Sequence, residues 1–67
     1  MIYAVVKAEL AEKAGFPQFT HRVLGDVMIL NENELRKIDG DIGEAANKLG
    51  GVTMTHNELQ NYINDRL

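Results

Sequence analysis

The sequence has no cysteine, no serine and no tryptophan among its 67 residues. Without cysteine, the chain cannot form disulfide bridges or thiolate-based zinc and iron–sulfur sites. Without serine or cysteine, it also lacks two common side chains of nucleophilic catalysis, and its threonines, at positions 20, 53 and 55, stand in no pattern that would activate them. We therefore expect a protein that is not an enzyme.

Sequence patterns that hold phosphates or metals are missing as well. Gly50-Gly51 is not followed by lysine and then serine or threonine, as a phosphate-binding loop requires. The acids of "DGDIGE" (39–44) alternate as in a calcium loop, but the sixth position is Glu44, where glycine is needed, and the twelfth is Gly50, where glutamate is needed. The sequence therefore predicts no metal site and no cofactor.

The two histidines, His21 and His56, are the remaining candidates for metal binding or acid–base chemistry. They lie 35 residues apart, and neither has a second histidine or a carboxylate at helical spacing that would make a ligand set. We expect His56 to face solvent in the first turn of a helix and His21 to lie on the surface of a strand.

Long hydrophobic runs are also absent. The N-terminal "MIYAVVKAEL" has too short an apolar run for a signal peptide or a membrane span, which together with the lack of cysteine favours a cytoplasmic protein without membrane contact. Hydrophobic residues make up 45% and aromatic residues 6%, which predicts a single folded domain over residues 1–67 with an aliphatic core. A domain this short buries only roughly 60% of its unfolded surface, so self-association is the expected additional support.

The net charge of −3 is concentrated in one segment. Residues 1–30 and 48–67 each balance their acidic and basic side chains, whereas residues 31–47 hold five acids against Arg36 and Lys37. We expect a nucleic-acid surface, if the protein has one, to avoid this segment.

The N-terminal segment predicts a helix over residues 3–14. Ile2, Val6 and Leu10 recur at intervals of four, alanines fill the positions between, and Gly15-Phe16-Pro17 would end the helix. A strand over "MIYAVV" is the alternative, because periodicity alone does not distinguish the two in a short apolar run.

The central segment predicts a β-hairpin over about 20–30, followed by helices. Gly25-Asp26 separates two apolar runs in "THRVLGDVMIL", which is typical of a two-residue turn. Asn31 with Glu34, and Thr55 with Glu58, have the spacing of capping boxes that begin helices. "LNENEL" (30–35) and "MTHNEL" (54–59) align at an offset of 24 residues, which fits either a duplication or two similar caps.

A further helix is expected over about 42–49, ended by Gly50-Gly51. These elements predict an α+β mini-domain: an N-terminal helix, a β-hairpin and three short helices packed on its apolar face. The expected core comprises Val5, Val6, Leu10, Phe16, Phe19, Val23, Val27, Ile29, Leu35, Ile38, Ile42, Leu49, Val52, Leu59 and Ile63.

The stretch 44–63, which contains "EAANKLGG" and "HNELQNYI", resembles the bihelical unit of bacterial helix-turn-helix DNA-binding regulators. The match consists of paired alanines, a leucine-glycine at the end of the first helix, a turn valine and a second helix in which Leu59 and Ile63 fit the pattern, although the turn is longer than usual. "ELAEKAGFPQFTHRVLG" (9–25) resembles the same motif less closely, with a proline in its turn. The resemblance implies that a second helix reads DNA.

The last helix would present a polar face. Its expected binding residues are His56, Asn57, Gln60, Asn61, Asn64 and Arg66. Amide side chains can pair with adenine edges, but phosphate binding needs more basic residues than Lys48 and Arg66 supply in this half. The sequence therefore favours a small interaction or regulatory protein of the kind common in bacteria and mobile elements, which binds a protein partner or its own copy, with a DNA-binding regulator as the alternative.

Overall fold

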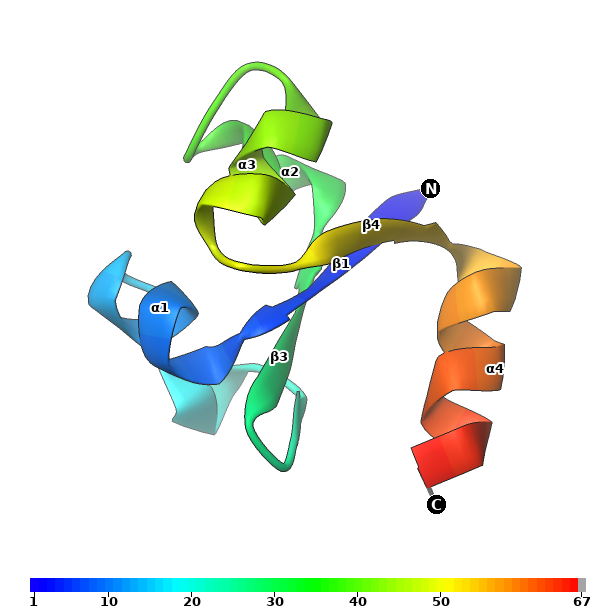
Figure 1. Ribbon diagram of the computed structural model, residues 1–67. Helices are drawn as coiled ribbons and strands as arrows, with labels where there is room; N and C mark the ends of the chain where they lie inside the picture. Colours follow the sequence, from blue (N-terminus) through cyan, green and yellow to red (C-terminus); the bar gives the residue numbers. More distant parts are fainter. Residues whose placement is uncertain (67) are drawn as a thin grey trace.

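Strand β1 (Ile2–Lys7) is the centre of the sheet in the computed structural model, which describes residues 1–66. It pairs antiparallel with β3 (Val27–Asn31) on one side and with β4 (Val52–Thr55) on the other. β2 (Val23–Leu24) pairs with β3, so the strand order within the described residues is β2-β3-β1-β4. Helices α1 (Ala8–Lys13), α2 (Glu32–Arg36), α3 (Ile42–Lys48) and α4 (His56–Arg66) cover the sheet (Figure 1). The α+β class and the single domain are thereby confirmed.

The expected N-terminal helix over residues 3–14 is wrong in its first half. Ile2–Lys7 is a strand, which was the alternative interpretation, and only Ala8–Lys13 is helical. Ala4 and Val6 are buried on one face of the sheet and Val5 on the other. A strand buried on both faces carries a continuous apolar run, which is why its period resembled that of a helix.

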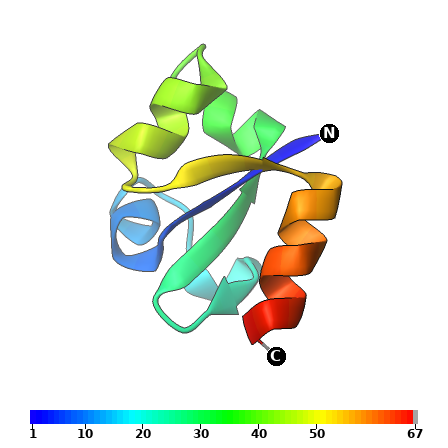
Figure 2. The same ribbon diagram turned by 45° about the vertical axis from the view of Figure 1, so that its right-hand side comes forward.

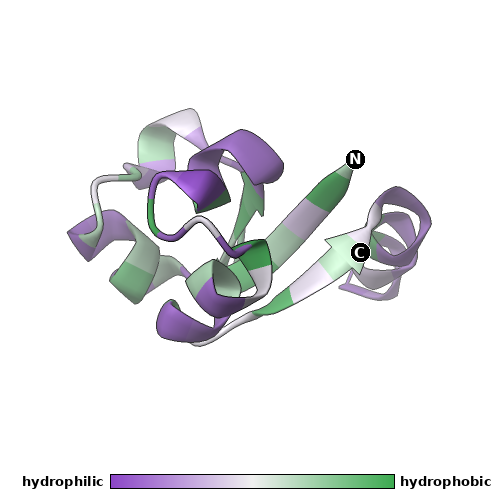
Figure 3. Ribbon diagram, turned by 90° about the horizontal axis from the view of Figure 1, so that it is seen from above, coloured by the Kyte–Doolittle hydropathy of each residue, from purple (hydrophilic) through white to green (hydrophobic). Residues whose placement is uncertain are grey.

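The two faces of the sheet are covered unequally. The three-helix face carries Ala4, Val6, Met28 and Leu30, which form one core with residues of α1, α2 and α3. The α4 face carries Val5, Val27 and Ile29, which pack with Leu59 and Ile63 of α4. Figures 1 and 2 show α4 alone on its side of the sheet, and Figure 3 shows that most of the ribbon of α4 has the colour of hydrophilic residues.

Two residues of the expected core are exposed. Phe19 lies in the one-turn 3₁₀ helix η1 (Gln18–Thr20) and is 89% exposed, and Val52 on edge strand β4 is 59% exposed. Phe19 sits outside the sheet in a turn that follows Pro17. Val52 pairs with Val5 and so lies on the α4 face, which a single helix covers only in part. Ala8, Ala11, Ala45 and Ala46 supply core contacts in their place, since small side chains allow helices to approach the sheet closely.

The predicted hairpin is confirmed at the expected turn. Val23 pairs with Met28 and Leu24 with Val27, which leaves Gly25-Asp26 as the connecting residues. Gly25 has a φ of 65°, and no residue other than glycine has positive φ in the described chain. A positive φ at the first turn position alone is the feature of a type II′ turn.

Both predicted capping boxes are present, and each one joins a strand directly to a helix. Asn31 ends β3 and caps α2: its side chain accepts from the Glu34 amide at 2.9 Å, and its own amide donates to Glu34 Oε1 at 3.0 Å. Thr55 ends β4, and its amide donates to Glu58 Oε1 at 2.9 Å. The two units, β3–α2 and β4–α4, flank β1 and place their helices on opposite faces of the sheet.

Candidate interaction surface on the C-terminal helix

Helix α4 is fixed to the sheet by apolar side chains. It begins directly after Thr55, whose hydroxyl accepts from the Glu58 amide at 3.3 Å. Leu59 and Ile63 are buried against Val5, and Tyr62 is half-buried beside them. Leu59, Tyr62 and Ile63 therefore face the sheet as expected, and this orientation decides which side of α4 meets solvent.

All six expected binding residues are exposed, and the structure groups four of them. Asn57, Gln60, Asn61 and Asn64 follow the spacing i, i+3, i+4 and i+7, which places them on one side of the helix. We call these four residues the amide stripe. It is an uncharged hydrogen-bonding surface on an ordered helix.

His56 and Arg66 lie at the two ends of α4 and interact with aromatic rings. His56 is the first residue of the helix and is exposed, as expected, with its ring centroid 6.1 Å from that of Tyr3. The Arg66 guanidinium carbon lies 4.3 Å from the centroid of the Tyr62 ring. This contact is a cation–π interaction that holds Arg66 against its own helix.

Two charged side chains in this half of the chain, Lys48 and Glu58, form contacts with nearby residues. Lys48 Nζ lies 2.8 Å from Asp39 Oδ2, and this hydrogen bond raises the pKa of Lys48 and lowers that of Asp39. The Thr55 amide and then its hydroxyl lower the pKa of Glu58. Lys48 and Arg66 thus each have a partner within the described part of the chain.

The segment that resembles a helix-turn-helix does not form a bihelical unit. The residues between α3 and α4 form strand β4, paired with β1, so the two helices lie on opposite faces of the sheet. The second stretch of this kind folds as α1, η1 and β2. The two helices are not adjacent because Val52–Thr55 lie between them and pair with β1 as a strand.

The open edge of β4 offers little backbone for pairing with another strand. The Lys7 amide donates to Leu49 O at 3.0 Å, so the odd-numbered amides of β1 point toward β4. By the same alternation, the amides of Thr53 and Thr55 in β4 point away from β1. The Thr55 amide already donates to Glu58 Oε1. Within β4, Thr53 is thus the one residue whose backbone N–H and C=O both point outward and take part in neither the sheet nor the cap.

A polar cluster that no sequence pattern predicted surrounds His21. This residue is not on a strand surface: it precedes β2, its side chain is 12% exposed, and its Nε2 contacts the carboxylate of Glu34. Its Nδ1 lies 2.9 Å from Pro17 O, and its ring packs edge-on against Phe16. No spacing rule links positions 21 and 34, because the fold brings them together.

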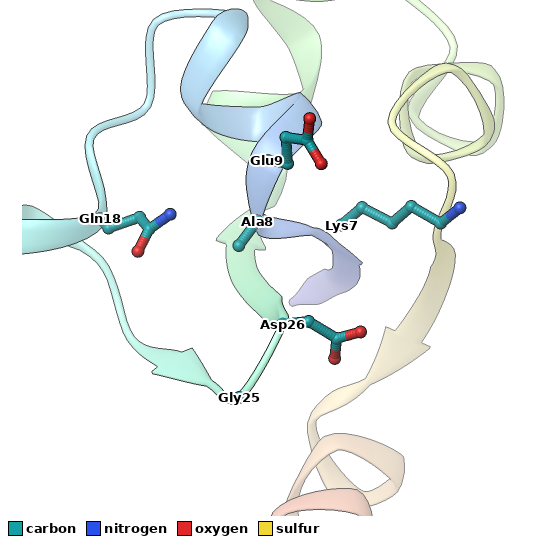
Figure 4. Close-up of a pocket in the computed structure, with 6 residues that line it drawn as sticks. All are labelled: Lys7, Ala8, Glu9, Gln18, Gly25 and Asp26. Atoms are coloured by element: carbon teal, nitrogen blue, oxygen red, sulfur yellow. The ribbon is translucent and has the colours of Figure 1, made fainter.

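A shallow hollow lies at the start of α1 (Figure 4). It has a volume of about 430 Å³ and is lined by Lys7, Ala8, Glu9, Gln18, Gly25 and Asp26. Figure 4 shows Lys7 and Asp26 extending to one side of the hollow, with Gln18 on the other side. Across residues 1–66, no three histidine, aspartate or glutamate side chains gather as a metal site would require.

Comparison with known proteins gives no assignment: no protein family model, curated protein or solved structure matches this chain. Among residues 1–66, no helix has both the length and the apolar character to cross a membrane.

Proposed function

We propose that this protein is a small non-enzymatic interaction or regulatory module that binds a protein partner or its own copy through α4. The observation that carries the proposal is the amide stripe: four exposed amides on one side of a helix whose other side is anchored by Leu59 and Ile63. An anchored helix loses little further entropy when a partner binds, and its uncharged amides are inexpensive to desolvate when they find hydrogen-bonding partners.

DNA binding is the alternative that the same stripe supports, because asparagine and glutamine can pair bidentately with adenine. The charge distribution supports it less. Lys48 is on α3, on the opposite face of the sheet, and is paired with Asp39, so Arg66 is the one basic side chain that α4 itself supplies within the described residues. Tight DNA binding draws on several phosphate contacts.

The proposal is tested with Asn61→Glu, which places a charge in the centre of the stripe. Sedimentation over a range of protein concentrations measures self-association of the wild type and the variant. We expect the variant to weaken it by at least tenfold, because an unpaired carboxylate in an interface is costly to desolvate. Asn47→Glu is the matched control, since Asn47 is exposed on α3, on the opposite face of the sheet.

Gel shifts with duplex DNA at several salt concentrations distinguish the alternative. Sequence-selective duplex binding at physiological salt, lost in Asn61→Ala, would replace the proposal with a DNA-binding function. If the wild-type protein stays monomeric, self-association is excluded and the proposed partner is a different protein. Equal effects of Asn61→Glu and Asn47→Glu would show that the stripe is not the binding surface.

A further inference from the structure

His21 connects two parts of the chain that have no backbone hydrogen bond to each other among the described residues. One part is the turn 16–21, which includes η1 and presents Phe19 at 89% exposure. The other is the start of α2, where Glu34 also closes the capping box with Asn31. Contact between His21 Nε2 and Glu34 Oε2 therefore ties the turn to the helix.

The two acceptors beside the His21 ring favour the form in which both ring nitrogens donate. Nδ1 faces the carbonyl oxygen of Pro17 at 2.9 Å, and Nε2 faces the Glu34 carboxylate. A carbonyl and a carboxylate only accept hydrogen bonds, so only the imidazolium, with two N–H groups, satisfies both. A neutral ring must direct a lone pair at one of them.

We propose that His21 is a proton-dependent latch that keeps the turn 16–21, and with it Phe19, ordered where the turn meets the start of α2. When the ring is protonated, Nδ1–H binds Pro17 and Nε2–H binds Glu34. When the ring loses a proton, one of these bonds is replaced by repulsion between lone pairs, and the turn loosens. The latch adds regulation by protons at a surface that the proposed function of α4 does not use.

Thr20 indicates which bond changes first. Its Oγ1 lies 3.0 Å from His21 Nδ1 and currently donates to Pro17 O at 3.1 Å. After deprotonation this hydroxyl can turn to donate to Nδ1, so the neutral ring keeps its proton on Nε2. The rearrangement thus occurs inside the turn, beside Phe19, while the bond to Glu34 is retained without its ion pair.

Other groups around His21 do not compete for its proton. Glu34 is the charged side chain that contacts the ring from α2, and Phe16 contacts it from the end of α1. Glu12 of α1 accepts from the Gln18 amide at 2.8 Å at the other end of the turn, and Arg22 is exposed. The pKa of His21 is raised from the ordinary value of 6.5, first by the hydrogen bond to Pro17 and next by that to Glu34.

The test is an NMR titration from pH 5 to 9 that follows the His21 ring nitrogens and the backbone amides of residues 18–20. We expect these amides to shift with the same midpoint as His21, above 6.5, and their heteronuclear NOE values to fall at the alkaline end. Amides that do not respond to the titration of His21 would overturn the latch.

Glu34→Gln tests the partner while preserving the helix cap, because glutamine also serves in a capping box. Its side-chain amide can donate to a neutral imidazole, so the turn should remain ordered at alkaline pH and the His21 midpoint should fall. Glu58→Gln makes the same change in the second capping box, where the carboxylate accepts from the Thr55 amide and pairs with no histidine in the described residues, and it should leave His21 and the turn unchanged. Equal responses of the two variants would contradict the proposal.

Thr20→Val provides an independent measurement that leaves both the cap and the ion pair in place. Without the hydroxyl, a neutral His21 has no donor for Nδ1, so the alkaline loosening of the turn should increase. An unchanged pH response in this variant would contradict the assigned rearrangement. Circular dichroism of each variant at pH 6 verifies that the sheet and helices are retained.

Discussion

The units β3–α2 and β4–α4 start from nearly the same sequence and differ in what surrounds them. Both have a capping residue, asparagine, glutamate and leucine at equivalent positions, and both join a strand to a helix without a loop. α2 packs against α3 and the sheet, and Leu35 is fully buried. α4 lies alone on the other face, and Leu59 keeps 7% exposure. The comparison shows that one local pattern can serve the core in one place and a surface in another.

The arrangement around β1 explains how the same unit reaches both faces. β3 and β4 are both antiparallel to β1, and their pairings are offset by one residue: Tyr3 pairs with Asn31 in β3 but with Met54 in β4. Side chains alternate between faces along a strand, so this offset turns the equivalent residues Leu30 and Met54 to opposite faces. The spatial relation is consistent with either a duplication or two similar caps.

The largest expected effect comes from the two equivalent leucines. Leu35→Ala should destabilise the protein by about 3–5 kcal/mol, because it leaves a cavity in a fully enclosed site. Leu59→Ala should cost about 2–3 kcal/mol, since α4 can settle onto the sheet from its open side. Urea denaturation measures both. Equal costs would show that α4 is packed as firmly as α2.

The attachment of the β4–α4 unit can be broken at Gly51. A Cβ there would lie 2.0 Å from Val5 O and 2.6 Å from Val6 Cα, so Gly51→Ala must push β4 away from β1. We expect a loss of about 3 kcal/mol. Gly40→Ala is the control, because its Cβ would meet nothing within 4 Å. A stable Gly51→Ala protein would show that β1 and β4 can separate at low cost.

The helix caps should have smaller and similar effects. Thr55→Ala removes the acceptor for the Glu58 amide, and Asn31→Ala removes the acceptor for the Glu34 amide. Each should cost about 1 kcal/mol in thermal or chemical unfolding. If Thr55→Ala leaves stability unchanged, the 3.3 Å contact of its hydroxyl is not a functional cap.

The smallest expected effects are changes in the free energy of unfolding with pH. They fall in opposite pH ranges for His21, which contacts the β3–α2 unit, and for Glu58 of the β4–α4 unit. Because folding raises the pKa of His21, its contribution is full below about 6.5 and is lost as pH rises through the folded value. Because folding lowers the pKa of Glu58, its contribution is present above the ordinary value of 4.5 and is lost as pH falls through the folded value. The free energy of unfolding of His21→Gln should therefore differ from that of the wild type mainly at the acidic end of the range, and that of Glu58→Gln mainly at the alkaline end. Divergence at the same end would contradict this assignment.

Local sequence rules predicted the parts of this protein that depend on neighbouring residues. The Gly25-Asp26 hairpin, the Asn31 and Thr55 caps and helix α3 were recoverable because turns and caps are made by side chains a few positions apart. The exposed side of α4 followed from the spacing of Leu59 and Ile63.

Tertiary structure decided the features that depend on distant residues. Residues 2–7 became a strand because β3 and β4 supply hydrogen bonds on both sides, which an apolar run cannot reveal by its period. β4 separated α3 from α4, which no helix pattern indicated. His21 met Glu34 through the packing of the turn 16–21 on α2. The sequence by itself therefore determined the turns, the caps and the polar stripe, and long-range pairing determined which elements meet and which surfaces remain open.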